Sequence, residues 1–410
     1  MNAKVSAAAV ALCVAGSSLT AQTQAPALPA PVPGAPAPSV QAPADPGYAA
    51  LIATCKTPPP ARGGRPGGPP AGAPGARGAG GPGGPPDGSR GAGGPGGPPD
   101  GNRGAAPAIP PGTPQAAGRG GPAPGPREYS VTEIPGVIAA GQQWKFVWQE
   151  AGNNGDGILG TDDGDLLVAQ NDNSRIIKLA ADGKTTVLYA DTRTGGSVSQ
   201  NTKGALFMTS RGLKQSIMQV TPTRRVLADS YQGDPLDCLG GVVNDLSADS
   251  KGGVYFTMGG VYYANPKGLV TKYGETTPNG IVLSADEKTL YVTNGPALAA
   301  FDVQPDGSLT NQREFVRWEG GGGDGLAIDA TGRVYVTANP GVHVIGPDGK
   351  YLGLIPTPRN VISTALGGRD KKTLFILARG AKNADGSELA NAAQVYSIPL
   401  IAQGYKGRAK

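Results

Sequence analysis

Four oxygen-bearing side chains stand beside short apolar runs in this chain of 410 residues. They are Asp156 in NNGDGIL, Asn244 in GGVVNDL, Asn279 in TTPNGIVL and Asp324 in GGGDGLAI. Carboxylate and amide oxygens are the ligands that Ca²⁺ and Mg²⁺ prefer. Taken singly, each is better read as a turn residue, because Asn-Gly and Asp-Gly are common turn dipeptides. Together, at corresponding positions, they favour a metal or catalytic site, provided that the fold gathers them.

The elements that would gather them come from a pattern that recurs along the chain. A turn, often with Asp and Gly, is followed by three or four β-forming residues. The copies are TDDGDLLVA (161–169), NTKGALFMT (201–209), DSKGGVYFT (249–257), DEKTLYVT (286–293), DATGRVYVT (329–337) and RDKKTLFIL (369–377). Their aligned large residues lie 40, 48, 36, 44 and 40 positions apart and are Leu167, Phe207, Tyr255, Tyr291, Tyr335 and Phe375.

A repeat of about 40 to 45 residues made of strands alone is typical of β-propeller blades. We therefore predict an all-β, six-bladed β-propeller over residues 128–402. The runs YSVTEI (129–134) and KFVWQ (145–149) precede the first copy, and we expect them to close the ring by pairing with VYSIPL (395–400). Because the inner strand of each blade lines the central channel, the four oxygen-bearing side chains would face one axis.

The first third of the chain has a different composition. Residues 22–127 are chiefly Ala, Pro and Gly, with almost no large apolar side chains to offset the entropy of ordering. We expect a disordered linker there, with one possible short helix over 45–57.

Residues 1–127 hold nine Lys and Arg against three Asp and Glu, which leaves 27 Lys and Arg against 28 Asp and Glu for the rest of the chain. The near-neutral remainder argues against a nucleic-acid partner. The basic linker either makes a weak contact with an anionic surface such as the cell envelope or, more simply, serves as a solvated spacer.

Residues 1–21 have the pattern of a secretory signal peptide, with Lys4 followed by the apolar run VSAAAVALCVAG. That run is too short to cross a bilayer, so we expect a periplasmic or secreted protein without a transmembrane segment. We also expect a monomer, with residues 403–410 as a C-terminal tail.

The cysteines and the single histidine restrict the chemistry. Cys55 and Cys238 remain after cleavage, and they either pair in an oxidising compartment or stay as free thiols. His343 stands in GVHVIG, an alternating strand pattern, and is read as structural. One histidine excludes His-rich zinc sites, and Ser-His or Cys-His catalysis could rest only on His343.

Three segments together resemble the SMP-30/gluconolactonase/LRE family, over about residues 128–400. They are VNDLSADSKGGVYFT (243–257), TPNGIVLSADEKTLYVTN (277–294) and GDGLAIDATGRVYVTANPGVHVIGPDGKYLGLIPTP (323–358). The resemblance implies a six-bladed propeller that hydrolyses a lactone with one divalent metal on the axis. Ca²⁺ is the expected ion, and Mg²⁺, Mn²⁺ or Zn²⁺ are the alternatives.

The resemblance also implies roles for single residues. Asn279 and Asp324 match the family's metal-binding asparagine and aspartate, and Asp324 matches its candidate general base. Asn244 matches the asparagine that faces the metal or the substrate. The family's further ligand is a glutamate in an EGP motif, where this chain offers Asp156, shorter by one methylene. Arg211, in FMTSRG, either directs a cation toward the substrate pocket or is a surface arginine.

The predicted function is hydrolysis of a lactone ester by water, with Asp324 as the base beside a metal Lewis acid. A non-catalytic propeller that binds a carbohydrate or protein partner, with a structural metal on the axis, is the alternative, because propellers host many functions. A strictosidine-synthase-like enzyme would need a glutamate acid, for which Glu275 is the nearby candidate. Glu150 is the second candidate for the missing glutamate ligand.

Overall fold

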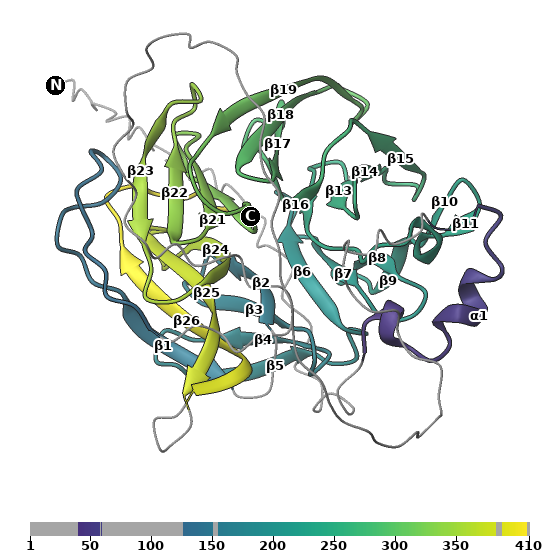
Figure 1. The fold of residues 1–410 in the computed structure, drawn as a ribbon, viewed down its shortest axis with the longest axis horizontal. Coiled ribbons are helices and arrows are strands. Elements are labelled where there is room, and N and C mark those ends of the chain that lie inside the picture. Colours follow the sequence, from purple (N-terminus) through teal and green to yellow (C-terminus); the bar gives the residue numbers. More distant parts are fainter. Residues whose placement is uncertain (1–39, 58, 60–125, 151–154, 383–387, 408–410) are drawn as a thin grey trace, which may run out of the picture. The chain divides into compact units, whose positions relative to one another are not determined.

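The computed structural model describes residues 40–57, 59, 126–150, 155–382 and 388–407. Six four-stranded antiparallel sheets lie around a common axis (Figure 1). This arrangement confirms the predicted all-β, six-bladed β-propeller. The other described elements are η1 (Ala42–Ala44), α1 (Tyr48–Ile52), η2 (Leu236–Leu239) and a two-stranded ribbon of β10 (Ser230–Tyr231) and β11 (Asp234–Pro235).

Each of the first five blades takes four strands in chain order, starting at the axis. Blade 1 holds β2 (Gly155–Gly160), β3 (Leu166–Gln170), β4 (Arg175–Leu179) and β5 (Thr185–Tyr189). Blade 2 holds β6 (Gly195–Gln200), β7 (Leu206–Ser210), β8 (Ser216–Gln219) and β9 (Arg225–Ala228). Blade 3 holds β12 (Leu246–Ala248), β13 (Val254–Thr257), β14 (Val261–Ala264) and β15 (Val270–Tyr273). Blade 4 holds β16 (Pro278–Leu283), β17 (Thr289–Asn294), β18 (Ala297–Val303) and β19 (Leu309–Arg317). Blade 5 holds β20 (Leu326–Ile328), β21 (Val334–Ala338), β22 (Gly341–Ile345) and β23 (Tyr351–Pro356).

The sixth blade closes the ring with a strand from the other end of the domain. Its strands are β24 (Val361–Gly367), β25 (Thr373–Lys382), β26 (Glu388–Pro399) and β1 (Lys145–Glu150). β1 pairs antiparallel with β26, with Lys145 opposite Ser397. The pairing predicted for the run 145–149 is therefore confirmed.

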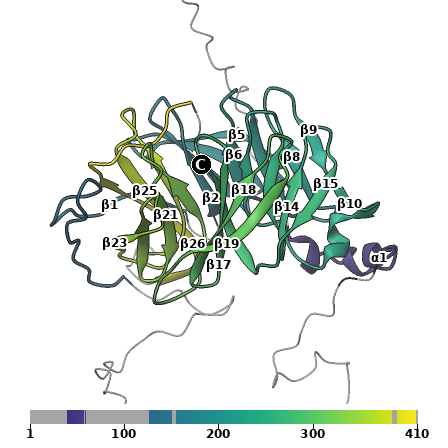
Figure 2. The ribbon, with the colours of Figure 1, turned by 90° about the horizontal axis from the view of Figure 1, so that it is seen from above.

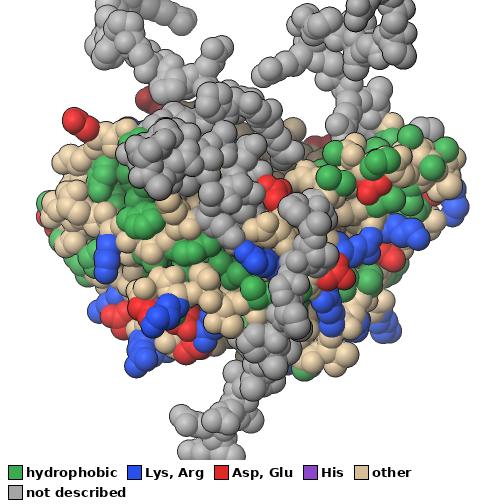
Figure 3. All heavy atoms as spheres, turned by 90° about the horizontal axis from the view of Figure 1, so that it is seen from below, with side chains coloured by type: hydrophobic (Ala, Val, Ile, Leu, Met, Phe, Trp, Pro, Cys, Tyr) green, Lys and Arg blue, Asp and Glu red, His purple; other side chains and the backbone are tan. Residues whose placement is uncertain are grey.

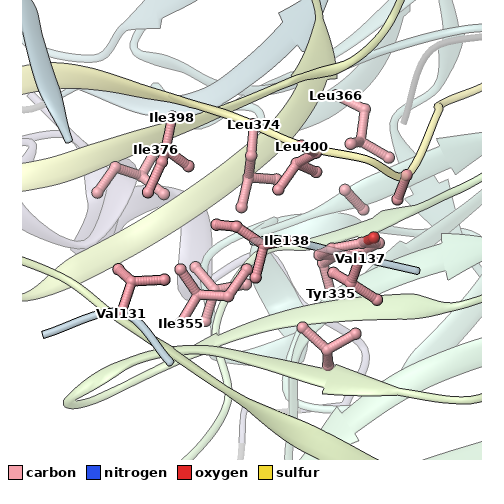
Figure 4. Packing of buried hydrophobic residues seen from close by; sticks show 14 of the residues in the cluster. Val131, Val137, Ile138, Tyr335, Ile355, Leu366, Leu374, Ile376, Ile398 and Leu400 are labelled. Carbon is pink, nitrogen blue, oxygen red and sulfur yellow. The ribbon is translucent and has the colours of Figure 1, made fainter. Parts of the chain in front are cut away.

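The pairing predicted for the run 129–134 is wrong. Ile134 forms only an isolated bridge to Ile138, across a turn in which Gly136 has a φ of +70°. This turn folds the run back on itself, and Val137 and Ile138 pack among buried residues of blades 5 and 6 (Figure 4). A strand would expose alternate side chains to solvent. The turn instead buries the apolar side chains of residues 131–138, which we call the wedge, between blades 5 and 6.

The hydrophobic core lies between neighbouring blades. The recurring sequence pattern supplies the second strand of each blade, and strands such as β13 and β21 are buried along their full length. Tyr255 and Tyr335 of that pattern are completely buried. On the edge shown in Figure 3, positive and negative side chains are interspersed on the surface that is not grey.

Residues 40–57, which we call the strap, contain η1 and α1. α1 lies at the edge of the molecule near β10 (Figures 1 and 2). It falls within the helix predicted over 45–57, although the Asp45 carboxylate accepts from the Gly47 N–H at 2.7 Å and does not cap the helix. Cys55 forms a disulfide with Cys238 of η2.

The prediction of a disordered linker over 22–127 therefore needs correction in the strap. Composition alone omits the disulfide and the backbone hydrogen bonds to the propeller, which offset the entropy of ordering this segment. Residues 22–39, 58 and 60–125 lie outside the described residues, as do residues 1–21.

The described part of the predicted C-terminal tail, 403–407, lies against the propeller. Gly404 forms a bridge to Asp329, and its N–H donates to the Lys371 carbonyl at 2.9 Å. Within the described ranges, no helix is both long and apolar enough to cross a membrane.

His343 lies in β22 and is 2% exposed. Its Nδ1 is 3.0 Å from the Tyr351 hydroxyl, and its ring is 5.4 Å from that of Trp318. This environment within blade 5 agrees with the structural reading of the sequence. Burial lowers the pKa of His343 from 6.5 to about 4.

We predict that this histidine makes the fold sensitive to acid. Above pH 6.5 the folded and unfolded states are both neutral at this site, but as the pH falls toward 4 the unfolded chain takes up a proton that the folded state excludes. The free energy of unfolding should fall by roughly 3 kcal/mol over that range. Denaturant titrations at several pH values should show a shallower fall for His343→Leu. The same pH dependence in both proteins would contradict the prediction.

Candidate functional site

The oxygen-bearing residues lie at the same end of the inner strands. Asp156 and Asn279 are the second residues of β2 and β16, while Asn244 and Asp324 precede β12 and β20 by two residues. Neighbouring inner strands contact one another around the ring, and β24 completes it against β2. All four residues are half-buried. The fold thus gathers them at one end of the central channel, which we call the axial mouth.

Arg211 connects two of these residues. It follows β7, and its side chain is 4% exposed. Its Nη1 pairs with the Asp156 carboxylate and donates to the Asn171 side chain. Its Nη2 donates to the backbone oxygen of Asn244 at 2.7 Å and to the side-chain oxygen at 2.8 Å. Its Nε donates to the Val243 carbonyl at 2.8 Å. A guanidinium has five N–H donors, so all of its hydrogen-bonding capacity is directed at the protein.

This geometry favours a positioning role for Arg211 over the predicted contact with substrate. A buried cation whose donors are taken up by protein acceptors fixes those acceptors and has no N–H left to offer. Gly196 permits the arrangement, because a Cβ there would lie 2.0 Å from the guanidinium carbon. We infer that Arg211 holds Asp156 and Asn244 in place.

The remaining residues continue this network around the mouth. The Asn244 amide nitrogen donates to the side-chain oxygen of Asn279. Gly280 then lets the next segment approach, since a Cβ at that position would lie 1.9 Å from the Asp324 carbonyl oxygen. The Asp324 N–H in turn donates to the Thr337 carbonyl at 2.7 Å. Asp156, Arg211, Asn244, Asn279 and Asp324 therefore follow one another around the axis.

The predictions missed a set of buried threonines that fix the backbone of these residues. They close four copies of the recurring pattern and are Thr209, Thr257, Thr293 and Thr337. The hydroxyl of Thr257 accepts from the Asp245 N–H at 3.1 Å and donates to the Asn279 carbonyl at 2.6 Å. The Thr293 hydroxyl accepts from the Asn279 N–H at 3.2 Å. Their recurrence at the last position of the pattern was the available signal.

Asp245, next to Asn244, has a structural role. It is 7% exposed, and its carboxylate accepts from the Ser197 hydroxyl and, at 3.0 Å, from the Ile281 N–H. One buried carboxylate thereby joins blades 2, 3 and 4 behind the mouth. A buried charge is tolerated when hydrogen-bond donors surround it.

The oxygen atoms at the axial mouth are of the kind that bind a hard divalent cation. Asp156 and Asp324 offer carboxylates, and Asn279 offers an amide oxygen. Over the described part of the chain, no three His, Cys, Asp or Glu side chains gather closely enough to hold a metal. A cation would thus depend on the amide oxygen and water as well as the carboxylates, and it would share Asp156 with Arg211. The metal ligands therefore stay a prediction.

The two glutamates considered from the sequence do not change this picture. Glu275 is exposed, and its N–H donates to the Gln312 side chain. The side chain of Glu150 lies outside what the structure describes.

The fold and the mouth together define a six-bladed propeller with a polar axial site. Residues 155–379 match the family model described as the SMP-30/Gluconolactonase/LRE-like region, and the chain belongs to that family. The predicted resemblance is confirmed.

Curated relatives are similar over part of their length. A gluconolactonase of Zymomonas mobilis is 29% identical over 211 residues, which covers 43% of this chain and 58% of that protein. The lactonase drp35 of Staphylococcus saprophyticus is 30% identical over 199 residues, covering 40% and 57%. The chain thus spans about half the length of the curated relatives it matches.

Solved structures agree on the fold. The gluconolactonase XC5397 of Xanthomonas campestris is 22% identical, with a TM-score of 0.55 over 70% of this chain and 99% of that one. Regucalcin of Agrobacterium tumefaciens, a calcium-binding protein, is 18% identical, with a TM-score of 0.50 over 62% and 96%. At these identities the likeness concerns the fold alone.

We predict that the Thr257 hydroxyl stabilises the mouth. Thr257→Val keeps the shape but leaves the buried Asp245 N–H and Asn279 carbonyl without this partner, which should cost about 1–3 kcal/mol of unfolding free energy. Thr257→Ser should recover most of that loss. Urea denaturation of the three proteins measures it, and equal stability of the Val and Ser variants would show that the hydroxyl contributes nothing.

Proposed function

We propose that this protein is a metal-dependent hydrolase that opens the ester ring of a lactone. The observation that carries the proposal is the cluster of Asp156, Asn244, Asn279 and Asp324 at one axial mouth, in a chain of this family. The names of two partial relatives, a gluconolactonase and a lactonase, support the same chemistry. The substrate is a small-molecule lactone, and which lactone is left open.

Asp324 is the proposed general base. Its carboxylate removes a proton from a water molecule while the water oxygen bonds to the lactone carbonyl carbon. The bond between that carbon and the ring oxygen then breaks, and the ring oxygen leaves as an alkoxide that takes a proton from solvent, which gives the hydroxyl group of the opened hydroxy acid. Asn244, held by Arg211 and Asn279, offers its amide to orient the substrate.

Asp156, Asn279 and Asp324 are the residues that would hold a divalent cation, with Ca²⁺ as the proposed ion. When bound there, such a cation supplies Lewis-acid polarisation of an ester carbonyl and a lower pKa for nearby water. Asp156 also forms an ion pair with the Arg211 guanidinium, so its carboxylate would contact both the arginine and the metal ion.

We also propose export of the chain to the periplasm or the medium. The signal-like residues 1–21 and the Cys55–Cys238 disulfide support this location, because disulfides persist in oxidising compartments. Cell fractionation tests it, and a mature chain recovered only from the cytoplasm would contradict it.

We predict that Asp324→Asn lowers kcat for lactone opening by about 100-fold or more, because an amide cannot accept the proton. Asp348→Asn is the matched control, since Asp348 is an exposed turn aspartate of the same blade whose carboxylate accepts the Lys350 N–H at 3.1 Å. A panel of lactones assayed by acid release measures both variants. If the wild-type protein opens no lactone, the binding-only alternative gains; if Asp324→Asn keeps full activity, another base is at work.

We predict that a chelator removes the activity and that Ca²⁺ restores it. In calorimetric titration of the chelated protein, Ca²⁺ should bind at one site, and Asp324→Asn should weaken binding at least about tenfold through loss of a charged ligand. Asp348→Asn should bind as the wild type does. Identical binding by both variants would place the cation away from the mouth.

A further inference from the structure

The strap lies outside the family region 155–379, yet one of its ends contacts the backbone of Arg211. The N–H of Ala42, which is completely buried, donates to the Arg211 carbonyl at 2.7 Å. The Thr194 hydroxyl donates to the Val40 carbonyl at 3.2 Å. This end of the strap therefore fastens the turn that carries the positioning arginine.

The other end is fixed to the segment that leads to Asn244. Cys55 is bonded to Cys238, 183 residues further along the chain, with Cα atoms 5.7 Å apart. The backbone N–H groups of Lys56 and Thr57 donate to the Asp234 carboxylate at 2.9 and 3.2 Å. Two kinds of contact thus hold this end.

Gln215 joins the two anchored regions inside the protein. It is completely buried, and its N–H donates to the Asp237 carboxylate at 2.9 Å. Its side-chain nitrogen donates to the Gly241 carbonyl at 3.0 Å, and its side-chain oxygen accepts from the Val243 N–H at 2.8 Å. The Val243 carbonyl in turn accepts from Arg211. The strap, the Arg211 turn and the segment 236–244 form one connected support behind Asn244.

The disulfide is the covalent part of this support. α1 has five residues, none of them buried, and a helix of that length is marginal on its own. A covalent link raises the local concentration of the strap at its docking surface and limits its escape.

We propose that the strap is a positioning element of the axial mouth, locked by the Cys55–Cys238 disulfide, which keeps Arg211 and Asn244 in the geometry that binds substrate. This inference rests on the proposed function for its catalytic consequence. Its structural consequence, that the strap keeps residues 241–245 well ordered, is independent of the proposed function.

The kinetic test compares the full chain with Cys55→Ser/Cys238→Ser, each with and without dithiothreitol. Loss of the disulfide should lower kcat/KM about tenfold, chiefly through KM, because small displacements of positioning groups are costly. Dithiothreitol should reproduce the loss in the wild type and leave the double variant unchanged. A change of less than about twofold in kcat/KM would overturn the proposal.

A double-mutant cycle separates positioning from general loosening. In an Asn244→Ala background the strap no longer positions the Asn244 side chain and acts only through Arg211 and Asp156, so loss of the disulfide should lower kcat/KM by less than it does in the wild type. An equal loss in both backgrounds would show that the disulfide acts on the fold as a whole and would overturn the assignment.

Hydrogen exchange tests the same proposal without turnover. The Val243 N–H donates to Gln215 and the Asn244 N–H to the Thr257 carbonyl at 2.8 Å, so peptides over 241–245 should exchange faster in the double variant. Peptides over β21 (Val334–Ala338), on another blade, should be unchanged. If no lactone is opened but 241–245 loosens, the proposed function fails and the strap's role stands. Unchanged exchange at 241–245 overturns the strap's role whatever the activity.

Discussion

Closing six twisted sheets into a ring is the constraint on which the structure depends. In this chain β1, from the beginning of the domain, completes the sixth sheet beside β26 and so joins the two ends of the ring. Once the ring is closed, every inner strand runs along the same channel. Residues placed at equivalent positions in different blades then meet, although more than a hundred residues separate Asp156 from Asp324 in the chain.

The same closure creates a difficulty at the mouth, where backbone groups and charges are partly removed from water. Buried polar groups need hydrogen-bond partners, because leaving one unpaired destabilises the fold by more than a single hydrogen bond stabilises it. Here the threonine hydroxyls match backbone groups, while Asp245 and Arg211 match several partners each. The residues proposed to contact the substrate or the metal ion are therefore held in place by threonines, Asp245 and Arg211, which have a supporting role.

The sequence predicted the ring and the position of the polar residues because both follow from local patterns. The β-forming run at each second strand recurs at nearly regular intervals, and Asp156, Asn244, Asn279 and Asp324 hold similar places before or within the inner strands. The wedge at 131–138 could not be predicted, because its apolar residues also suit a strand and only a left-handed glycine turn distinguishes the two.

The supports of the site depended on contacts between distant parts of the chain, which no local pattern contains. The Arg211 side chain contacts four residues, Asp156 and Asn171 at blade 1 and Val243 and Asn244 just before blade 3, and the strap reaches its backbone from outside the repeats. Composition marked residues 40–57 as part of a linker, since short apolar stretches among prolines give no sign of a docking surface. Cys55 and Cys238 were visible, but their pairing was one of two open readings.

The family match and the folding unit have different boundaries. The match begins at residue 155 and ends at 379, inside the sixth blade, so β1 and β26 fall outside it. A chain cut to the matched region would keep five complete sheets and leave β24 and β25 with an unpaired edge, open to pairing with another molecule. The matched family region is therefore shorter than the ring of six complete sheets, which needs β1 and β26 from outside it.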